Sequence, residues 1–217
     1  ATFLKAQGYE VGHSLVEKDK LSLAKDLLQE AEEWDVPLLL PTDVLVAEEI
    51  KTGAKTLAVS IADIPLNSHV VDIGPQTIEL FCTELKKCHT IMWNGPLGIY
   101  EISQFAQGTK SMANFLSTVN ATTVIGGGSS AEIVQIMGLA HKMTHVSTGG
   151  GASLRFLEGA TLPGIEVLPN KYQTLLEEFM VVSESDYLDK VGDRQPYRSL
   201  LAKNGVTNLS QVNERVV

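Results

Sequence analysis

The chain contains 217 residues, 44% of them hydrophobic and 20% charged, which is enough to bury one sizeable core with a small appendage. Its 17 basic and 26 acidic residues give a formal net charge of −9 without any basic cluster, so a nucleic-acid backbone is not an expected partner. No apolar run reaches the length of a membrane span, and we expect the protein not to span a membrane.

The N-terminal part of the chain reads as two helices followed by a strand. Residues 1–8 are typical of the last turns of a helix that stops at Gly8. A strong amphipathic helix begins at Asp19 or Lys20. Its apolar face carries Leu21, Ala24, Leu27, Leu28, Ala31 and Trp34. The longest apolar run, Val36–Pro41, then predicts a buried strand.

Strands and helices alternate along the rest of the main domain. Strands are predicted at Thr56–Ile61, His89–Trp93, Thr122–Ile125 and Thr144–Val146. Helices are predicted at Gln76–Lys87, which Pro75 opens, and at Phe105–Leu116. Short strands separated by helices of this length indicate βαβ units. We therefore predict an α/β fold, a doubly wound, Rossmann-like parallel sheet with helices on both faces.

The chain changes character after Pro163 and Gly164. We predict one domain over residues 1–168 and a C-terminal extension over 169–217 that is mostly irregular, with one helix at Tyr172–Val182. A segment of this composition is a candidate docking element for a neighbouring protein, ordered on binding.

Two glycine triplets give the clearest functional signal. They consist of Gly126, Gly127 and Gly128, and of Gly149, Gly150 and Gly151. Each follows a predicted strand and precedes a helical pattern, an arrangement that presents backbone N–H groups to a phosphate. The triplets and the loop Asn94–Gly98 all fall at carboxyl ends of strands, where such sheets bind ligands. The same glycines also fit turns that the fold alone requires.

Reactive and aromatic side chains elsewhere have structural interpretations. If Cys82 and Cys88 lie on one helix, their Cα atoms are about 9 Å apart, too far for a disulfide. Their spacing fits no common metal site, so we expect two reduced thiols in the core. We expect Trp34 and Trp93 to pack in the core or at a pocket edge, and His145 to be a core histidine.

Five stretches resemble the C-terminal, nucleotide-binding domain of phosphoglycerate kinases. They are Phe3–Gly8, Ser14–Lys20, Asp72–Pro75, Trp93–Gly98 with Glu101, and His145–Leu154. The match is collinear from residue 1 to about residue 168 and is most similar to cyanobacterial and plastid members. The resemblance implies a two-lobed family fold in which the C-terminal lobe binds MgATP or MgADP.

The resemblance also implies roles for individual residues. Asn94, Pro96 and Gly98 would line the nucleotide groove, and the carboxylate of Glu101 would accept hydrogen bonds from the ribose hydroxyls. The two glycine triplets would face the phosphates and the transferring group. Phosphoryl transfer asks a protein mainly for positioning and charge stabilisation, part of which backbone N–H groups supply.

Several features depart from the family pattern. Ser129 stands where the family has an aspartate that helps to hold the metal-bound nucleotide, and a hydroxyl carries no charge to replace a carboxylate. Val70, next to His69, stands where a glycine is expected under the adenine, so its side chain would crowd the groove. Arg155 replaces a usual glutamate. The family's first strand of this lobe, its Gly-Gly-Ala-Lys stretch and its phosphoglycerate-binding lobe have no counterpart in this sequence.

These departures lead to two hypotheses. We favour a descendant that has lost catalysis and serves as an accessory subunit, with no catalytic residue, no metal and no cofactor. Its partners would be protein subunits, bound through an open sheet edge and residues 169–217. The alternative is the nucleotide-binding portion of an active phosphoglycerate kinase, which binds MgADP or MgATP and transfers phosphate between 1,3-bisphosphoglycerate and ADP.

The start of the chain bears on its location. It begins at Ala1 instead of Met, which is typical of a processed or incomplete chain. Together with the similarity to plastid members, this predicts a plastid protein, and the alternative locations are the mitochondrion and the cytoplasm.

Overall fold

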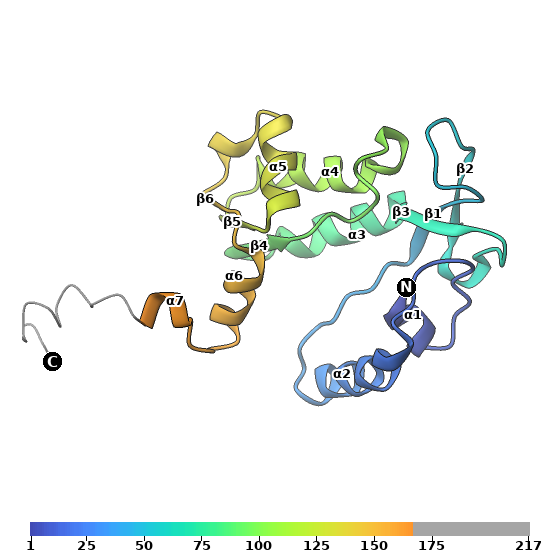
Figure 1. The fold of residues 1–217 in the computed structure, drawn as a ribbon, viewed down its shortest axis with the longest axis horizontal. Coiled ribbons are helices and arrows are strands. Elements are labelled where there is room, and N and C mark those ends of the chain that lie inside the picture. The colour runs from blue at the N-terminus through green and yellow to red at the C-terminus, as the bar shows by residue number, and fades with distance from the viewer. Residues whose placement is uncertain (167–217) are drawn as a thin grey trace, which may run out of the picture. The chain divides into compact units, whose positions relative to one another are not determined.

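Two three-stranded sheets organise the protein in the computed structural model, which describes residues 1–166 (Figure 1). Residues Ala1–Gly159 form one compact unit, and a second unit begins at Ala160. Of this second unit the described range contains only the short helix α7 (Pro163–Glu166). The helix predicted at Tyr172–Val182 and the extension over 169–217 lie outside the described residues.

The first helices confirm the expected start of the chain. Helix α1 (Thr2–Ala6) ends before Gly8, whose φ of +95° is the left-handed conformation that glycine adopts at a helix end. The 3₁₀ turn η1 (Lys18–Lys20) leads into α2 (Leu21–Glu33), as predicted. Helix α2 packs against α1, but Ala24 is its only buried residue. Its apolar face is therefore largely uncovered.

The segment after α2 corrects one prediction. The buried strand expected at Val36–Pro41 is wrong, because these residues belong to no helix or strand of the described chain. Val36 is 57% exposed and Leu39 is 43% exposed, and only Leu40 packs partly against a core cluster. A strand needs a neighbour for its backbone groups. None of the six described strands supplies one here.

The first sheet is antiparallel, which the sequence did not predict. It contains β1 (Asp43–Ala47), β2 (Thr56–Ser60) and β3 (His69–Ile73) in the order β2-β1-β3. Only β2 was expected. The connections over residues 48–55 and 61–68, the latter including the 3₁₀ turn η2 (Ile61–Asp63), are shorter than a parallel crossover requires. The short connections therefore favour antiparallel pairing.

The second sheet confirms the predicted α/β fold. Its parallel strands are β4 (Thr90–Asn94), β5 (Thr122–Gly126) and β6 (His145–Ser147), in the order β4-β5-β6. The helices that alternate with them are α3 (Pro75–Leu85), α4 (Gln107–Leu116), α5 (Gly128–Ile136) and α6 (Gly150–Leu157). The 3₁₀ turns η3 (Ser103–Phe105) and η4 (Ala140–Lys142) complete this part.

One apolar cluster holds the second sheet to its helices. Its buried members are Ile91, Trp93, Met112, Ala113, Leu116, Ile125, Ile133, Val134 and Met143. They come from β4, β5, α4 and α5, and from the segment before β6. The prediction that Trp93 packs in the core is confirmed, whereas Trp34, predicted to do the same, is 77% exposed.

A buried carboxylate joins the first sheet to helix α3. Asp43 of β1 accepts hydrogen bonds from the backbone N–H groups of Gln76 at 3.0 Å and Thr77 at 2.7 Å, in the first turn of α3. The hydroxyl of Thr77 in turn accepts from the backbone N–H groups of Thr42 and Asp43. Orphan N–H groups at a helix start are thereby satisfied by the neighbouring sheet, which fixes α3 against β1.

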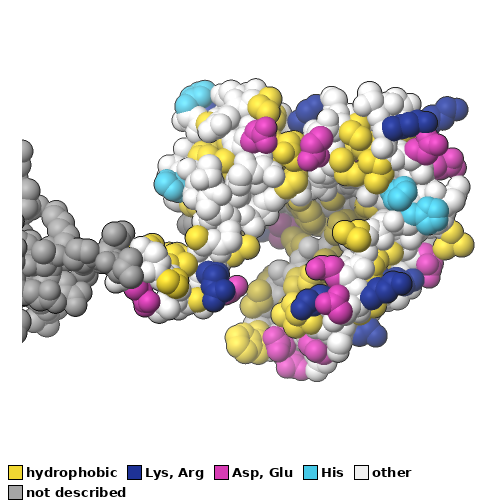
Figure 2. Space-filling model, in the orientation of Figure 1, with side chains coloured by type: hydrophobic (Ala, Val, Ile, Leu, Met, Phe, Trp, Pro, Cys, Tyr) yellow, Lys and Arg dark blue, Asp and Glu magenta, His cyan; other side chains and the backbone are white. Residues whose placement is uncertain are grey.

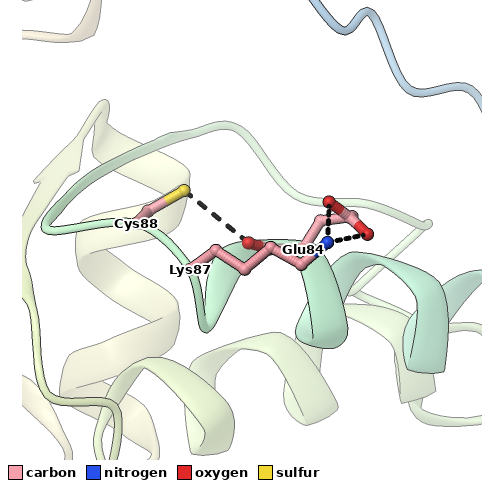
Figure 3. Close-up of polar contacts among 3 residues, drawn as sticks. All are labelled: Glu84, Lys87 and Cys88. Atoms are coloured by element: carbon pink, nitrogen blue, oxygen red, sulfur yellow. Dashed lines mark hydrogen bonds and ion pairs between the residues drawn. The ribbon is translucent and has the colours of Figure 1, made fainter.

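The two cysteines are free, but neither lies in the core as predicted. Cys82 is half-buried on α3, and Cys88 is exposed just beyond the end of that helix. Figure 3 shows the Sγ atom of Cys88 directed at the carbonyl oxygen of Glu84, 3.8 Å away, beside the ion pair between Lys87 and Glu84. Burial raises the pKa of the Cys82 thiol, and the charge of Lys86 opposes this only in part.

We predict that iodoacetamide labels Cys88 well before Cys82. The thiolate is the reactive form, so both the lower exposure and the raised pKa protect Cys82. Peptide mass spectrometry of the folded protein at pH 8 measures the two rates. The control is the protein unfolded in urea, where both thiols are accessible. If the ratio of the Cys88 rate to the Cys82 rate were the same in the folded protein as in urea, the placement of the two thiols would be contradicted.

Within residues 1–166, no helix is both long enough and apolar enough to cross a bilayer.

Candidate functional site

The three parallel strands end side by side. Asn94, the last residue of β4, pairs in register with Gly126, the last residue of β5, and Gly126 pairs with Ser147 at the end of β6. Because all three strands run the same way, their carboxyl ends form one edge of the sheet. Open α/β sheets bind their ligands at this edge.

Each glycine triplet forms the junction between a strand and a helix at this edge. In the first triplet, Gly126 ends β5, Gly127 is the N-cap and Gly128 begins α5. The φ of +93° at Gly127 requires glycine. In the second triplet, Gly149 is the N-cap of α6, which Gly150 begins. The predicted strand–glycine–helix pattern is thus confirmed twice, and two helix N-termini lie next to the strand ends.

The two triplets approach each other closely around Asn94. A Cβ atom placed on Gly150 would lie 2.8 Å from the Cα atom of Gly127 and 2.6 Å from Oδ1 of Asn94. A Cβ atom on Gly127 would lie 3.0 Å from the same oxygen. Side chains at these two positions would therefore separate the helix starts. The backbone N–H groups of both helices carry partial positive charge, so their convergence favours an anion.

Two other triplet positions face open space. A Cβ atom on Gly128 or on Gly151 would meet no described atom within 4 Å. Neither residue has a positive φ, so the backbone there does not require glycine. The lack of a side chain at these positions leaves the first turns of α5 and α6 accessible.

The loop that follows β4 is fixed by three elements. The backbone N–H of Gly95 donates to Oγ of Ser130 on α5 at 2.8 Å. The N–H of Leu97 donates to Oγ1 of Thr109 on α4 at 3.0 Å. The N–H of Ile99 donates to the carbonyl of Val71 on β3 at 3.0 Å. This loop, which was predicted to line the ligand groove, is therefore held in place at three points.

Asp72 is a buried residue whose carboxylate links β3 to the start of α4. Its carboxylate accepts from the backbone N–H of Gly108 at 2.7 Å, at the start of α4, and from that of Ile73 at 2.9 Å. Burial raises the pKa of the Asp72 carboxyl above its ordinary value of 3.8, while these N–H groups and that of Gln107 oppose the rise. A Cβ atom on Gly98 or Gly108 would overlap this carboxylate. Gly98 thus has a packing role that the sequence did not predict.

The remaining predicted site residues lie further from the triplets or at the surface. Pro96 is exposed in the loop after β4, and Glu101 is exposed beyond it. No hydrogen bond within residues 1–166 joins the Glu101 side chain to either triplet, so its proposed contact with ribose stays a prediction. Ser129, the second residue of α5, is also exposed.

The structure corrects the interpretation of one of three further residues. Val70 is half-buried and packs partly against the core cluster of the first sheet, which includes Val44 and Val46, and its crowding of the groove stays a prediction. His145, expected in the core, is exposed at the start of β6. His69, which the sequence left unassigned, lies beside His13 with ring centroids 5.4 Å apart.

The sequence analysis missed the buried polar residues that accept hydrogen bonds from the backbone around the site. Ser130, Thr109 and Asp72 are each buried to at least 99%. Ser130 and Thr109 occupy apolar-facing positions of helices, and polar residues at such positions were a signal for an internal hydrogen bond. Asp72 precedes a Gly-Pro helix start and was read only as part of a turn.

Residues 1–166 contain no group of three or more histidine, cysteine, aspartate or glutamate side chains able to hold a metal ion. The expectation of a chain without a metal or cofactor is a prediction that this finding does not test.

The family is decided by comparison with known proteins. The family model described as phosphoglycerate kinase matches residues 1–160. The chain belongs to the phosphoglycerate kinase family. The phosphoglycerate kinase of Pelotomaculum thermopropionicum is 51% identical over 170 residues, and that of Dictyoglomus turgidum is 51% identical over 171 residues. In both cases the match covers 78% of this chain and 43% of the relative.

Solved structures of the family have the same fold. The phosphoglycerate kinase of Coxiella burnetii superposes with a TM-score of 0.72 at 41% identity, over 76% of this chain and 43% of that one. The enzyme of Pyrococcus horikoshii gives a TM-score of 0.63 at 28% identity, over 76% and 42%. The chain therefore spans less than half the length of the family members that it matches.

Proposed function

We propose that this chain is the nucleotide-binding portion of a phosphoglycerate kinase, in which the N-termini of α5 and α6 bind the phosphates of ADP or ATP. The observation that carries the proposal is the close approach of Gly127 and Gly150 around Oδ1 of Asn94. Two helix starts with bare backbone N–H groups at one sheet edge form an anion site. The relatives that match the chain are named phosphoglycerate kinases.

The reaction that this assignment suggests is that of the named relatives. Phosphate would pass between 1,3-bisphosphoglycerate and ADP, with this chain holding the magnesium-bound nucleotide. Its contribution would be positioning and stabilisation of charge on the transferring group by the two helix N-termini. The hydrogen-bonded loop from Gly95 to Ile99 would form a rigid wall of the nucleotide groove.

A second candidate function is a non-catalytic accessory subunit, which the sequence alone favours. Ser129 supports it, since a neutral hydroxyl stands at the exposed second position of α5 where the family resemblance implies an aspartate. The other local argument for this candidate was crowding by Val70. Val70 packs partly against the first-sheet core, which weakens that argument. The nucleotide-binding proposal is therefore the better supported of the two.

Calorimetric titration with MgADP tests the two candidates. We expect this chain to bind MgADP, and expect Ser129→Asp to tighten binding because a carboxylate at that position contacts the magnesium ion. Ser129→Asn is the matched control, as it has nearly the same size without the charge. If the native chain does not bind MgADP but the Ser129→Asp variant does, the result would instead favour the accessory subunit. No binding by any of the three proteins would contradict the nucleotide-binding proposal.

A further inference from the structure

Two histidines from distant parts of the chain meet at the surface of the first sheet. His13 lies in the loop between α1 and η1, and His69 is the first residue of β3. Their ring centroids are 5.4 Å apart, with an angle of 63° between the ring planes. His13 is exposed and His69 is half-buried. Figure 2 shows two adjacent histidine side chains at the surface, in the part of the view where Figure 1 labels β1 and β3.

Backbone contacts hold the two histidines opposite each other. The N–H of His13 donates to the carbonyl oxygen of Ser68 at 2.8 Å, and the N–H of Val70 donates to Oγ of Ser14 at 2.9 Å. Gly12 permits this approach, because a Cβ atom there would overlap the carbonyl oxygen of Ser68 and its φ of +55° favours glycine. The loop is therefore fixed to β3 at the positions that carry the rings.

The spacing of the rings matches that of two imidazoles on one metal ion. A ligating nitrogen lies about 1.1 Å from its ring centroid and about 2.0–2.1 Å from zinc, so each centroid would lie about 3.2 Å from the metal. At a tetrahedral angle of about 109°, the two centroids would be roughly 5.2 Å apart, close to the observed 5.4 Å. Rotation about the Cβ–Cγ bonds redirects the nitrogens while leaving the centroids nearly in place, so the backbone need not move.

The ring nitrogens are available for a ligand. Within residues 1–166, no hydrogen bond or ion pair engages the imidazole of His13 or of His69. Neutral imidazole suits zinc, copper and nickel, whereas magnesium and calcium prefer oxygen ligands. An edge-to-face contact between two aromatic rings accounts for the same spacing without any ligand. Only metal binding requires a nitrogen from each ring and a transition metal ion, and this difference makes the two explanations separable.

We propose that His13 and His69 together bind a zinc ion, which fastens the loop between α1 and η1 to β3. Residues 1–166 contain no group of three or more possible metal ligands, so water molecules complete the coordination of this ion. The site differs from the expectation, made from the sequence, of a chain without a metal. It contains neither glycine triplet, and the proposal does not depend on whether the triplets bind nucleotide.

Calorimetric titration of this chain with zinc chloride tests the proposal. We expect one zinc ion to bind per chain in the micromolar range, and magnesium chloride to give no binding at this site. Zinc should also raise the melting temperature, because the two histidines come together only in the folded state. The MgADP titration described above is made without zinc, so failure of nucleotide binding is seen separately from failure of zinc binding.

Matched variants assign the zinc ion to the histidine pair. His13→Gln and His69→Gln should each weaken zinc binding about a hundredfold or more, since the loss of even an outer partner of a ligand costs about 10–100-fold. Zinc should no longer raise the melting temperature of either variant. His141→Gln is the control, because His141 is an exposed histidine of η4, and it should leave the zinc affinity unchanged.

Nuclear magnetic resonance of the native chain gives a test that needs no variant. In spectra that detect imidazole nitrogens, zinc should shift the signals of His13 and His69 and leave those of His89, His141 and His145 in place. No zinc binding would overturn the proposal, as would equal affinities in His13→Gln, His69→Gln and His141→Gln. Zinc-dependent shifts at His89 without shifts at His13 and His69 would also overturn it, because they would place the ion near the exposed thiol of Cys88.

Discussion

Replacing Asp72 by alanine should lower the free energy of unfolding by about 3 kcal/mol or more. The carboxylate is 1% exposed and accepts backbone hydrogen bonds from Ile73 and Gly108. Without it, N–H groups at the start of α4 are left buried and unpaired, and a cavity opens beneath Gly98. Urea denaturation followed by circular dichroism measures the loss. Asp26→Ala on exposed α2 is the control and should change stability by less than about 0.5 kcal/mol.

The pH dependence of this effect has a defined sign. Burial raises the pKa of Asp72 in the folded protein above 3.8, so the folded state binds the proton more tightly than the unfolded state. Stability from this group is therefore fully present below pH 3.8 and is lost as the pH rises through the folded pKa. The stability advantage of the native chain over Asp72→Asn should be largest at low pH and shrink as the pH rises. An advantage that grows with pH would contradict the raised pKa.

Gly150→Ala should both destabilise the protein and abolish nucleotide binding, whereas its neighbour Gly151→Ala should leave stability nearly unchanged. The added methyl at position 150 would lie 2.8 Å from the Cα atom of Gly127, so the starts of α5 and α6 must separate. Overpacking of this kind costs about 1–3 kcal/mol. At position 151 the methyl meets nothing within 4 Å, and alanine is a better helix former than glycine.

The variants Gly128→Ala and Gly151→Ala distinguish a site that binds an anion from a turn that only the fold requires. If phosphate binds over the first turns of α5 and α6, then Gly151→Ala and Gly128→Ala should weaken MgADP binding at constant melting temperature, because each methyl would stand in accessible space. Thermal melting and calorimetry on the same samples measure both quantities. Unchanged affinity in Gly128→Ala and Gly151→Ala, in a chain that binds MgADP, would place the ligand elsewhere.

Local sequence patterns were sufficient for much of the site. The strand, the glycine triplet and the following helix are contiguous, and glycine has few other uses at such a junction, so Gly126–Gly128 and Gly149–Gly151 were identified from sequence. The helix that begins at Pro75 was also predicted from a local signal, because proline favours the first position of a helix. The short antiparallel strands β1 and β3 were missed, because their apolar residues carry no clear period.

Contacts between distant segments were not accessible to the same reasoning. Ser130 and Gly95 are 35 positions apart, and Asp72 and Gly108 are 36 apart, so no local pattern connects them. The run Val36–Pro41 shows the opposite error. Its composition is typical of a strand, but a strand also needs neighbours, and none exists among the described residues.

The sequence by itself determined the family, the α/β alternation and the glycine junctions, because each depends on residues adjacent in the chain. Only the tertiary structure decided that Gly127 and Gly150 meet around Asn94, that Val70 packs partly against the first-sheet core, and that Gly98 lies against a buried carboxylate. The physical reason is that backbone conformation is set by near neighbours, whereas close approach and burial depend on how separate segments pack.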